Sequence, residues 1–248
     1  MKHLKIIISS LVVVGVSYMY TSCAKTAPDM ISATDTNFSN KATVQIIETA
    51  VNATRNYVYI DGSAITGTTI GTGSIYPVSG NGFLVSGGLR SFLIRDTLPT
   101  APSPTAPQVP YTFAENFDAG QHYTIFIYDT VTALKQKTVK DNIVVPTDTT
   151  SRLRFANFVY STVAVPNVDV YSFNRQAVIF SNIPITGVTD FIPYPSRLPL
   201  DTLYVRETGT TNVLIKTSTT VLTPKRSYTF VYRGSYKGTK ATTLYATY

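Results

Sequence analysis

The side chains that most often carry catalysis or hold metals are scarce in this chain. It has one cysteine, Cys23, and two histidines, His3 and His122. A Ser-His-Asp or Cys-His arrangement needs a base beside its nucleophile, and a zinc site needs several Cys or His ligands close together. His122 directly precedes Tyr123 in an expected turn, where a loop role fits it better than catalysis. We therefore expect no enzyme activity, no cofactor and no metal.

The position of Cys23 indicates a different chemistry, which is lipidation. Before it, two lysines are followed by 15 mostly apolar residues, 6–20, fewer than the about 20 that span a membrane. The segment resembles a bacterial lipoprotein signal, in which the cysteine becomes the lipidated first residue of the mature protein. The resemblance implies a signal peptide over residues 1–22, a lipidated flexible tether over residues 23–40, and a Gram-negative outer membrane. An ordinary secretory signal or an uncleaved N-terminal anchor are the alternatives.

The composition of the rest of the chain favours strands. Thr, Val, Ile and Tyr are abundant, whereas good helix formers are scarce and Glu occurs only at Glu48, Glu115 and Glu207. Removal of residues 1–22 takes away two lysines, so 19 basic and 14 acidic residues leave a net charge of +5. This mild excess has no basic run, which argues against nucleic acid as a partner.

The chain contains an internal repeat. FLIRDT at residues 92–97 agrees in type with LYVRET at residues 203–208, apart from one position. Four further pairs of blocks follow the same order: 43–47 with 152–156, 56–60 with 168–172, 65–69 with 185–189, and 117–127 with 222–232. The pattern predicts two homologous domains, residues 41–148 and residues 149–248. The first carries a proline-rich insertion at residues 98–110.

Short strand-like segments in each domain predict an all-β fold of two tandem immunoglobulin-like sandwiches. In residues 152–155, alternation places Leu153 and Phe155 on a core face and both arginines in solvent. Residues 125–128 lack polar alternation, which predicts a strand covered on both faces. Tyr123 and Tyr228 each begin a late strand, where a tyrosine corner and simple core packing are both open.

These blocks, together with the join NIVVPTDTTSRLRFANFVYS, resemble tandem copies of a bacterial cell-envelope domain, the domain-of-unknown-function family 4397. The resemblance covers about residues 41–248. It implies an immunoglobulin-like sandwich in a surface or periplasmic setting, and it carries over no catalytic residue. The first copy departs at Tyr57, where the second has Asp169.

Aromatic residues gather in segments that break the strand pattern, and an arginine accompanies them. Rigid rings and a guanidinium suit contacts with a surface glycan or a protein. The candidate ligand contacts are Tyr76, Phe83, Tyr111, Phe191, Tyr194 and Arg197. The alternative is that these rings plug the ends of the two cores. The two interpretations predict different stabilities for alanine variants, because only the truncation of a ring that plugs a core lowers the free energy of unfolding strongly.

Asp-Thr followed by an aliphatic residue or threonine matches an acceptor pattern for bacterial O-glycosylation. It occurs around four threonines, Thr97, Thr130, Thr149 and Thr202. Thr149 is the best candidate because it lies in the exposed join between the predicted domains. The alternative is that Asp-Thr pairs mark strand ends and turns.

These patterns together predict a non-catalytic, lipid-anchored cell-envelope protein that acts as a binding or spacer module. Its expected partners are the membrane, through the lipidated Cys23, and a surface glycan or protein. Two other classes stay open. An envelope glycan hydrolase would need convergent carboxylates in a cleft. A structural subunit of a surface assembly would instead expose a strand edge or a terminal arm.

Overall fold

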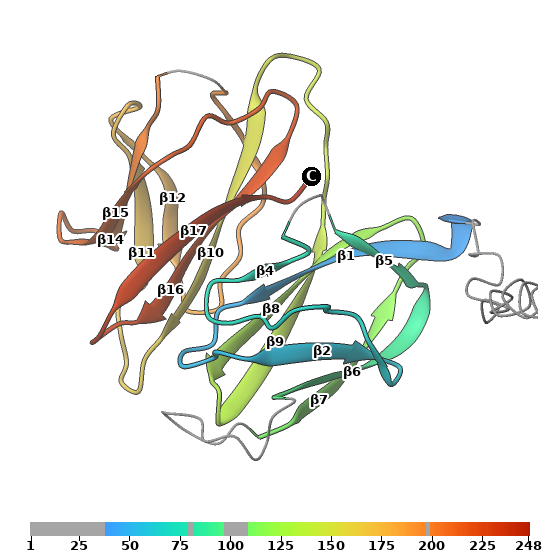
Figure 1. The fold of residues 1–248 in the computed structure, drawn as a ribbon. Helices are drawn as coiled ribbons and strands as arrows, with labels where there is room; N and C mark the ends of the chain where they lie inside the picture. The colour runs from blue at the N-terminus through green and yellow to red at the C-terminus, as the bar shows by residue number, and fades with distance from the viewer. Residues whose placement is uncertain (1–37, 79–81, 97–108, 197–198) are drawn as a thin grey trace, which may run out of the picture. The chain divides into compact units, whose positions relative to one another are not determined.

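A computed structural model of the chain describes residues 38–78, 82–96, 109–196 and 199–248 (Figure 1). The predicted signal peptide, Cys23, Thr97 and Arg197 lie outside the described residues. The fold below is that of the compact unit formed by residues 39–248. Over the described ranges, none of the helical segments is long and apolar enough to cross a membrane.

The described fold is all-β, apart from one short 3-10 turn, η1 (Phe38–Asn40). Two sheets come from residues 41–141, which we call the first half. Its first sheet, sheet A, contains β1 (Lys41–Glu48), β4 (Ile75–Tyr76), β5 (Phe83–Ser86), β8 (His122–Thr130) and β9 (Ala133–Asp141). Its second, sheet B, contains β2 (Asn56–Ile60), β3 (Ser63–Ala64), β6 (Gly88–Asp96) and β7 (Tyr111–Phe117).

Two further sheets come from residues 151–246, which we call the second half. Sheet C contains β10 (Ser151–Tyr160), β13 (Ile192–Tyr194), β16 (Ser227–Ser235) and β17 (Lys240–Ala246). Sheet D contains β11 (Val168–Ser172), β12 (Ala177–Ile183), β14 (Thr202–Glu207) and β15 (Val213–Ser218). Each half therefore pairs two sheets, as the sandwich prediction requires.

The strand order of the two halves agrees. Sheet A runs β4-β1-β8-β9 and sheet C runs β13-β10-β16-β17, while sheets B and D run β3-β2-β6-β7 and β12-β11-β14-β15. In both halves the opening strand is parallel to the late central strand, with Thr43 opposite His122 and Arg152 opposite Ser227. These registers allow positions of one half to be matched with positions of the other.

Each half has its own apolar core between its two sheets. The first includes Val44, Ile46 and Val58, and the second includes Leu153, Phe155 and Val170. Period-two alternation produces this pattern, since β2 buries every second residue. Ile125, Phe126 and Ile127 are all fully buried, which confirms a strand covered on both faces.

A third cluster joins the halves, because sheet A packs against sheet C. It contains Ile47 and Phe126 from sheet A, and Ala156, Phe158, Val231 and Tyr245 from sheet C. The rings of Phe126 and Phe158 stack with centroids 4.3 Å apart. Sheet C is therefore covered on both faces, so the prediction that Arg154 lies in solvent is wrong: its side chain is only 2% exposed.

The hydrogen bond expected of a tyrosine corner occurs in both halves. The backbone N–H of Asp118 donates to Oη of Tyr123 at 3.0 Å, and that of Thr223 donates to Oη of Tyr228 at 2.8 Å. Each donor lies five residues before its tyrosine, so the hydroxyl ties the incoming loop to the start of the strand. The rings also belong to the two cores.

Candidate binding site at the junction of the two halves

A buried ion pair lies where sheets A and C meet. Nη1 of Arg154 donates to Oδ1 of Asp141 at 2.5 Å, and both side chains are 2% exposed. The other two nitrogens of the guanidinium also form hydrogen bonds, with Nη2 donating to Thr124 at 2.9 Å and Nε donating to Thr229 at 2.8 Å. A buried charge is tolerated only when it is paired and hydrogen-bonded in this way.

Further contacts hold the junction together. Nζ of Lys137 in the first half donates to the carbonyl of Thr186 in the second at 2.7 Å. The guanidinium of Arg233 lies against Gly73, where a Cβ atom would come within 2.3 Å of Nη2. Gly73 also has a φ of +91°, in the left-handed region that favours glycine. Residues at the junction are therefore restricted both in size and in the hydrogen bonds that they form.

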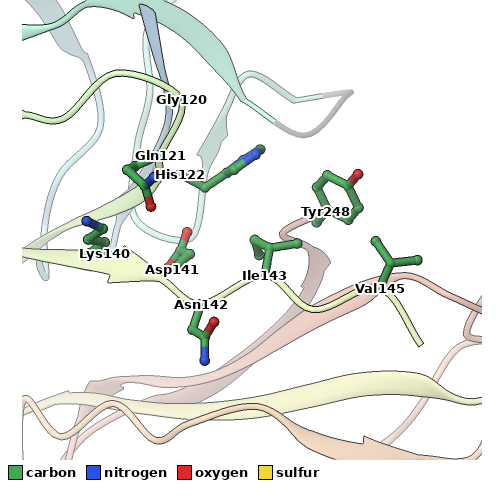
Figure 2. Close-up of a pocket in the computed structure, with 9 residues that line it drawn as sticks. All are labelled: Gly120, Gln121, His122, Lys140, Asp141, Asn142, Ile143, Val145 and Tyr248. Carbon is green, nitrogen blue, oxygen red and sulfur yellow. The ribbon is translucent and has the colours of Figure 1, made fainter. Parts of the chain in front are cut away.

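A cavity of about 580 Å³ opens beside the ion pair (Figure 2). Its lining comes from the turn before β8 and the first residue of that strand, the end of β9, the connection that follows β9, and Tyr248, two residues after β17. The nine residues are Gly120, Gln121, His122, Lys140, Asp141, Asn142, Ile143, Val145 and Tyr248. Segments from both halves and from their connection thus meet at one cavity.

Several polar groups of this cavity have no partner among the described residues. The side-chain amides of Gln121 and Asn142 form no hydrogen bond there, and Figure 2 shows them on neighbouring parts of the lining. Nδ1 of His122 is buried and likewise has no partner. The His122 ring meets the Tyr248 ring edge to face, with centroids 5.5 Å apart and planes at 88°. Two amides and two rings are thus available to a ligand.

The charged groups of the cavity are already engaged. Asp141 accepts from Arg154 with one oxygen and from Thr124 with the other, at 2.7 Å. Lys140 pairs with Asp118 at 3.0 Å, and this hydrogen bond raises the pKa of the lysine above its ordinary value. A carboxylate whose two oxygens are both bonded to buried partners is poorly placed to exchange a proton with a ligand. The lining therefore suits recognition of an uncharged polar ligand better than acid-base chemistry.

The structure corrects the role expected for Tyr194. This side chain is 2% exposed and belongs to the second core, and its hydroxyl donates to the buried carboxylate of Asp201. Burial and this carboxylate together raise the pKa of the Tyr194 hydroxyl. Strand β13 pairs with β10 here, so the segment that was predicted to be a loop is part of sheet C. Tyr194 is a core residue and not a surface contact.

The other candidate contacts do not form one site. Tyr76, Phe83 and Tyr111 are half-buried and pack against the first core, and the Tyr76 hydroxyl donates to the carbonyl of Ile65. Phe191 lies under the Arg154 guanidinium, 4.6 Å from its carbon to the ring centroid. Tyr76, Phe83 and Tyr111 therefore support the first core, in line with the alternative interpretation, and Phe191 covers the junction arginine, which neither interpretation predicted.

The described glycosylation candidates lie at strand ends. Thr149 is exposed, in the turn where the Asp148 carboxylate accepts from the backbone N–H of Thr150 at 2.9 Å. Thr130 is the last residue of β8 and Thr202 the first of β14, and both are half-buried. Exposure leaves Thr149 as the preferred candidate, and its modification stays a prediction.

Sequence reasoning did not find the junction site. Gln121, Asn142 and Tyr248 lie far apart in the sequence and carry no recognisable motif. The one usable sequence signal was the Arg-x-Arg of β10. Two arginines at alternate positions lie on the same face of a strand, and an arginine that is buried there needs a partner. His122 was expected in a turn, but it is the first residue of β8 and pairs with Thr43 and Asp141, and Tyr123 was singled out for its hydrogen bond and not for the cavity.

Comparison with known proteins adds no family assignment. No protein-family model matches the chain, and no curated protein is a significant match. The resemblance to family 4397 therefore stays a prediction. Within the residues that the structure describes, there is also no group of three or more His, Cys, Asp or Glu side chains placed to hold a metal ion.

Proposed function

We propose that this protein is a non-catalytic, lipid-anchored binding module of the bacterial cell envelope. It is built from two copies of one immunoglobulin-like sandwich, residues 41–148 and 149–248. Matching sequence blocks, matching strand orders and a tyrosine hydrogen bond at the same place in each half support the duplication. The N-terminal sequence supports attachment through a lipidated Cys23.

The junction cavity is the observation that supports a binding role most directly. It offers aromatic rings and unpaired amides, while its one carboxylate is fully used by Arg154 and Thr124. Binding sites combine apolar walls with a few unpaired polar groups that fix the orientation of the ligand. A neutral glycan fits this chemistry, because a sugar ring can stack on Tyr248 while its hydroxyls bond Gln121 and Asn142.

The test is binding of the full chain, in detergent, to immobilised neutral oligosaccharides of hexose and N-acetylhexosamine units. We expect the paired substitution Gln121→Ala and Asn142→Ala to lower affinity about tenfold, and Asn116→Ala to have no effect. Asn116 is an exposed amide on β7, away from the cavity. Unchanged affinity in the paired variant, or no binding by the unaltered chain, contradicts the proposal.

The same samples separate binding from hydrolysis. After long incubation, mass spectrometry should recover the oligosaccharides intact, because the cavity has no free carboxylate to act as acid or base. Release of shorter sugars by the unaltered chain would instead favour an envelope glycan hydrolase.

The anchor has its own test. Cys23→Ala should release the protein from membranes on alkaline washing and leave its far-ultraviolet circular dichroism unchanged, because the lipid and the folded unit are separate. Retention of the variant on washed membranes would contradict lipidation at Cys23.

A further inference from the structure

The outer face of sheet D carries a group of aromatic side chains that no described element covers. Tyr171 and Tyr204 are cross-strand partners with ring centroids 6.1 Å apart, and Phe173 lies 6.3 Å from Tyr204. Phe173 is 51% exposed and the neighbouring Val178 is 48% exposed. Adjacent exposed apolar residues of this kind mark interaction sites on soluble domains.

Arg206 extends this group with an uncommitted cation. Its guanidinium carbon lies 3.8 Å from the centroid of the Tyr171 ring and 5.3 Å from that of Tyr204. Within the described part of the chain it forms no ion pair, and its Nε is buried without a hydrogen-bond acceptor. A register shift at Val205 and Arg206 interrupts the pairing of β14 with β15, and such bulges redirect a side chain.

The carboxylate nearest in register forms no ion pair with this arginine. Asp169 is opposite Arg206 on β11, but its oxygens accept from the backbone N–H groups of Asn182 and Gly209 and from the hydroxyl of Thr208. A second basic residue, Lys216, is exposed and opposite Tyr204 on β15. The face is therefore aromatic and positively charged.

Local hydrogen bonds hold the Tyr171 ring and the turn beside it in place. The Tyr171 hydroxyl donates to Oε1 of Gln176 at 2.9 Å, and Nε2 of Gln176 donates to the carbonyl of Phe173 at 2.5 Å. One glutamine in the β11–β12 turn thus holds the Tyr171 ring and the backbone that carries Phe173. Pre-organised rings lose little conformational entropy when a ligand stacks on them.

The first half has only part of this arrangement. Tyr59 and Arg95 occupy the positions of Tyr171 and Arg206, and the guanidinium of Arg95 again lies over the tyrosine ring, at 4.8 Å. Leu93 and Asp61, however, replace Tyr204 and Phe173. The first half therefore keeps the cation over one ring and lacks the continuous row.

We propose that the outer aromatic face of sheet D, formed by Tyr171, Phe173, Tyr204, Arg206 and Lys216, binds an acidic polysaccharide. Sugar rings stack on the three aromatic side chains, and a carboxylate or sulfate of the chain accepts hydrogen bonds from Arg206 and an ionic contact from Lys216. The positive charges of Arg206 and Lys216 favour an acidic glycan over a neutral one. This surface is distinct from the junction cavity, so the inference does not depend on the function proposed above.

Affinity electrophoresis of the full chain tests it, with polygalacturonate, dextran sulfate or neutral dextran cast in the gel. We expect retardation by one or both acidic polymers and none by dextran, and the responsive polymer tells whether carboxylate or sulfate is preferred. Arg206→Gln and Tyr204→Ala should each weaken retardation at least tenfold without shifting the melting temperature. No retardation by either acidic polymer, or equal retardation by dextran, overturns the proposal.

The matched control is Arg95→Gln, which removes the same charge from the equivalent position of the first half. We expect it to change retardation less than twofold. An equal loss in Arg95→Gln and Arg206→Gln would show a general effect of net charge and would overturn the assignment to this face.

Discussion

The two halves of the molecule place different side chains at the same point of the junction. Gln45 lies opposite Thr124 in sheet A, and Arg154 lies opposite Thr229 in sheet C, so the two residues occupy matching positions. Gln45 makes one side-chain hydrogen bond, from its Nε2 to the carbonyl of Ala246 in the other half at 3.2 Å, and its Oε1 is buried without a partner among the described residues. Arg154 needs Asp141, Thr124 and Thr229. The charge at this position therefore has three side-chain partners, including a carboxylate from the other half, whereas the neutral amide has one backbone partner.

A second pair of matching positions also has an ionisable side chain in one half and a neutral side chain in the other. Glu48 and Asn157 each accept a hydrogen bond from the backbone N–H two residues later, Ala50 at 3.0 Å and Val159 at 3.3 Å. Only Glu48 can ionise. Its other oxygen accepts from Asn56 at 2.7 Å, and burial raises its pKa from 4.5 to about 8. The same local geometry is thus sensitive to pH in one half and insensitive in the other.

The largest expected effect concerns Glu48. Its folded pKa is above its unfolded pKa, so the native state binds the extra proton and the free energy of unfolding falls as pH rises from 4.5 to 8. The loss amounts to about 5 kcal/mol at most. Urea unfolding at several pH values should show this fall in the unaltered chain and not in Glu48→Gln. Asn157→Gln should keep the fall; parallel curves for Glu48→Gln and the unaltered chain would contradict this account.

Removal of Asp141 tests the charged member of the first comparison. Asp141→Ala leaves Arg154 buried without its carboxylate, which costs about 3–5 kcal/mol of unfolding free energy. Asp190→Ala, which removes an exposed aspartate, should change stability by less than about 0.5 kcal/mol. Equal small losses in the two variants would mean that the ion pair contributes little to the junction.

The corrected position of Tyr194 predicts a core defect. Tyr194→Ala should lower the free energy of unfolding by about 3 kcal/mol or more, because it leaves a cavity and removes a donor from Asp201. Val85 occupies the matching position of the first half and is also buried, so Val85→Ala should cost less, in proportion to the smaller volume removed. A negligible change in the free energy of unfolding for Tyr194→Ala would contradict the core position of that residue.

The smallest effect concerns the tyrosine corners. Tyr123→Phe and Tyr228→Phe each leave a backbone N–H without its acceptor, at a cost of about 1–2 kcal/mol. Thermal unfolding should give similar losses in the two variants. A loss in one variant alone would show that the matching hydrogen bonds do not have matching roles.

Sequence patterns were sufficient for the features that depend on local order. Alternation in residues 152–155 placed Leu153 and Phe155 correctly, and the paired Tyr123 and Tyr228 indicated the hydrogen bonds found in both halves. The all-β fold followed from strand-forming residues and the absence of amphipathic helical patterns. These inferences need only neighbours along the chain.

Features that depend on packing between sheets were not predictable. Alternation shows that Arg154 lies opposite the core of its own half, but not that another sheet covers that side. Tyr194 was expected in a loop because prolines flank it, although β13 pairs with β10 there. The outer aromatic face was missed for a related reason, since its rings come from two segments, residues 171–173 and Tyr204, that only sheet D brings together.

The central claim is that the junction around Arg154 and Asp141 holds the two halves together as one cooperative unit. Native-state hydrogen exchange of the full chain tests it, because β8 and β16 report on separate halves. We predict equal opening free energies for their most protected amides in the unaltered chain, and unequal values in Asp141→Ala. Unequal values in the unaltered chain would contradict the claim, since the halves would then open independently.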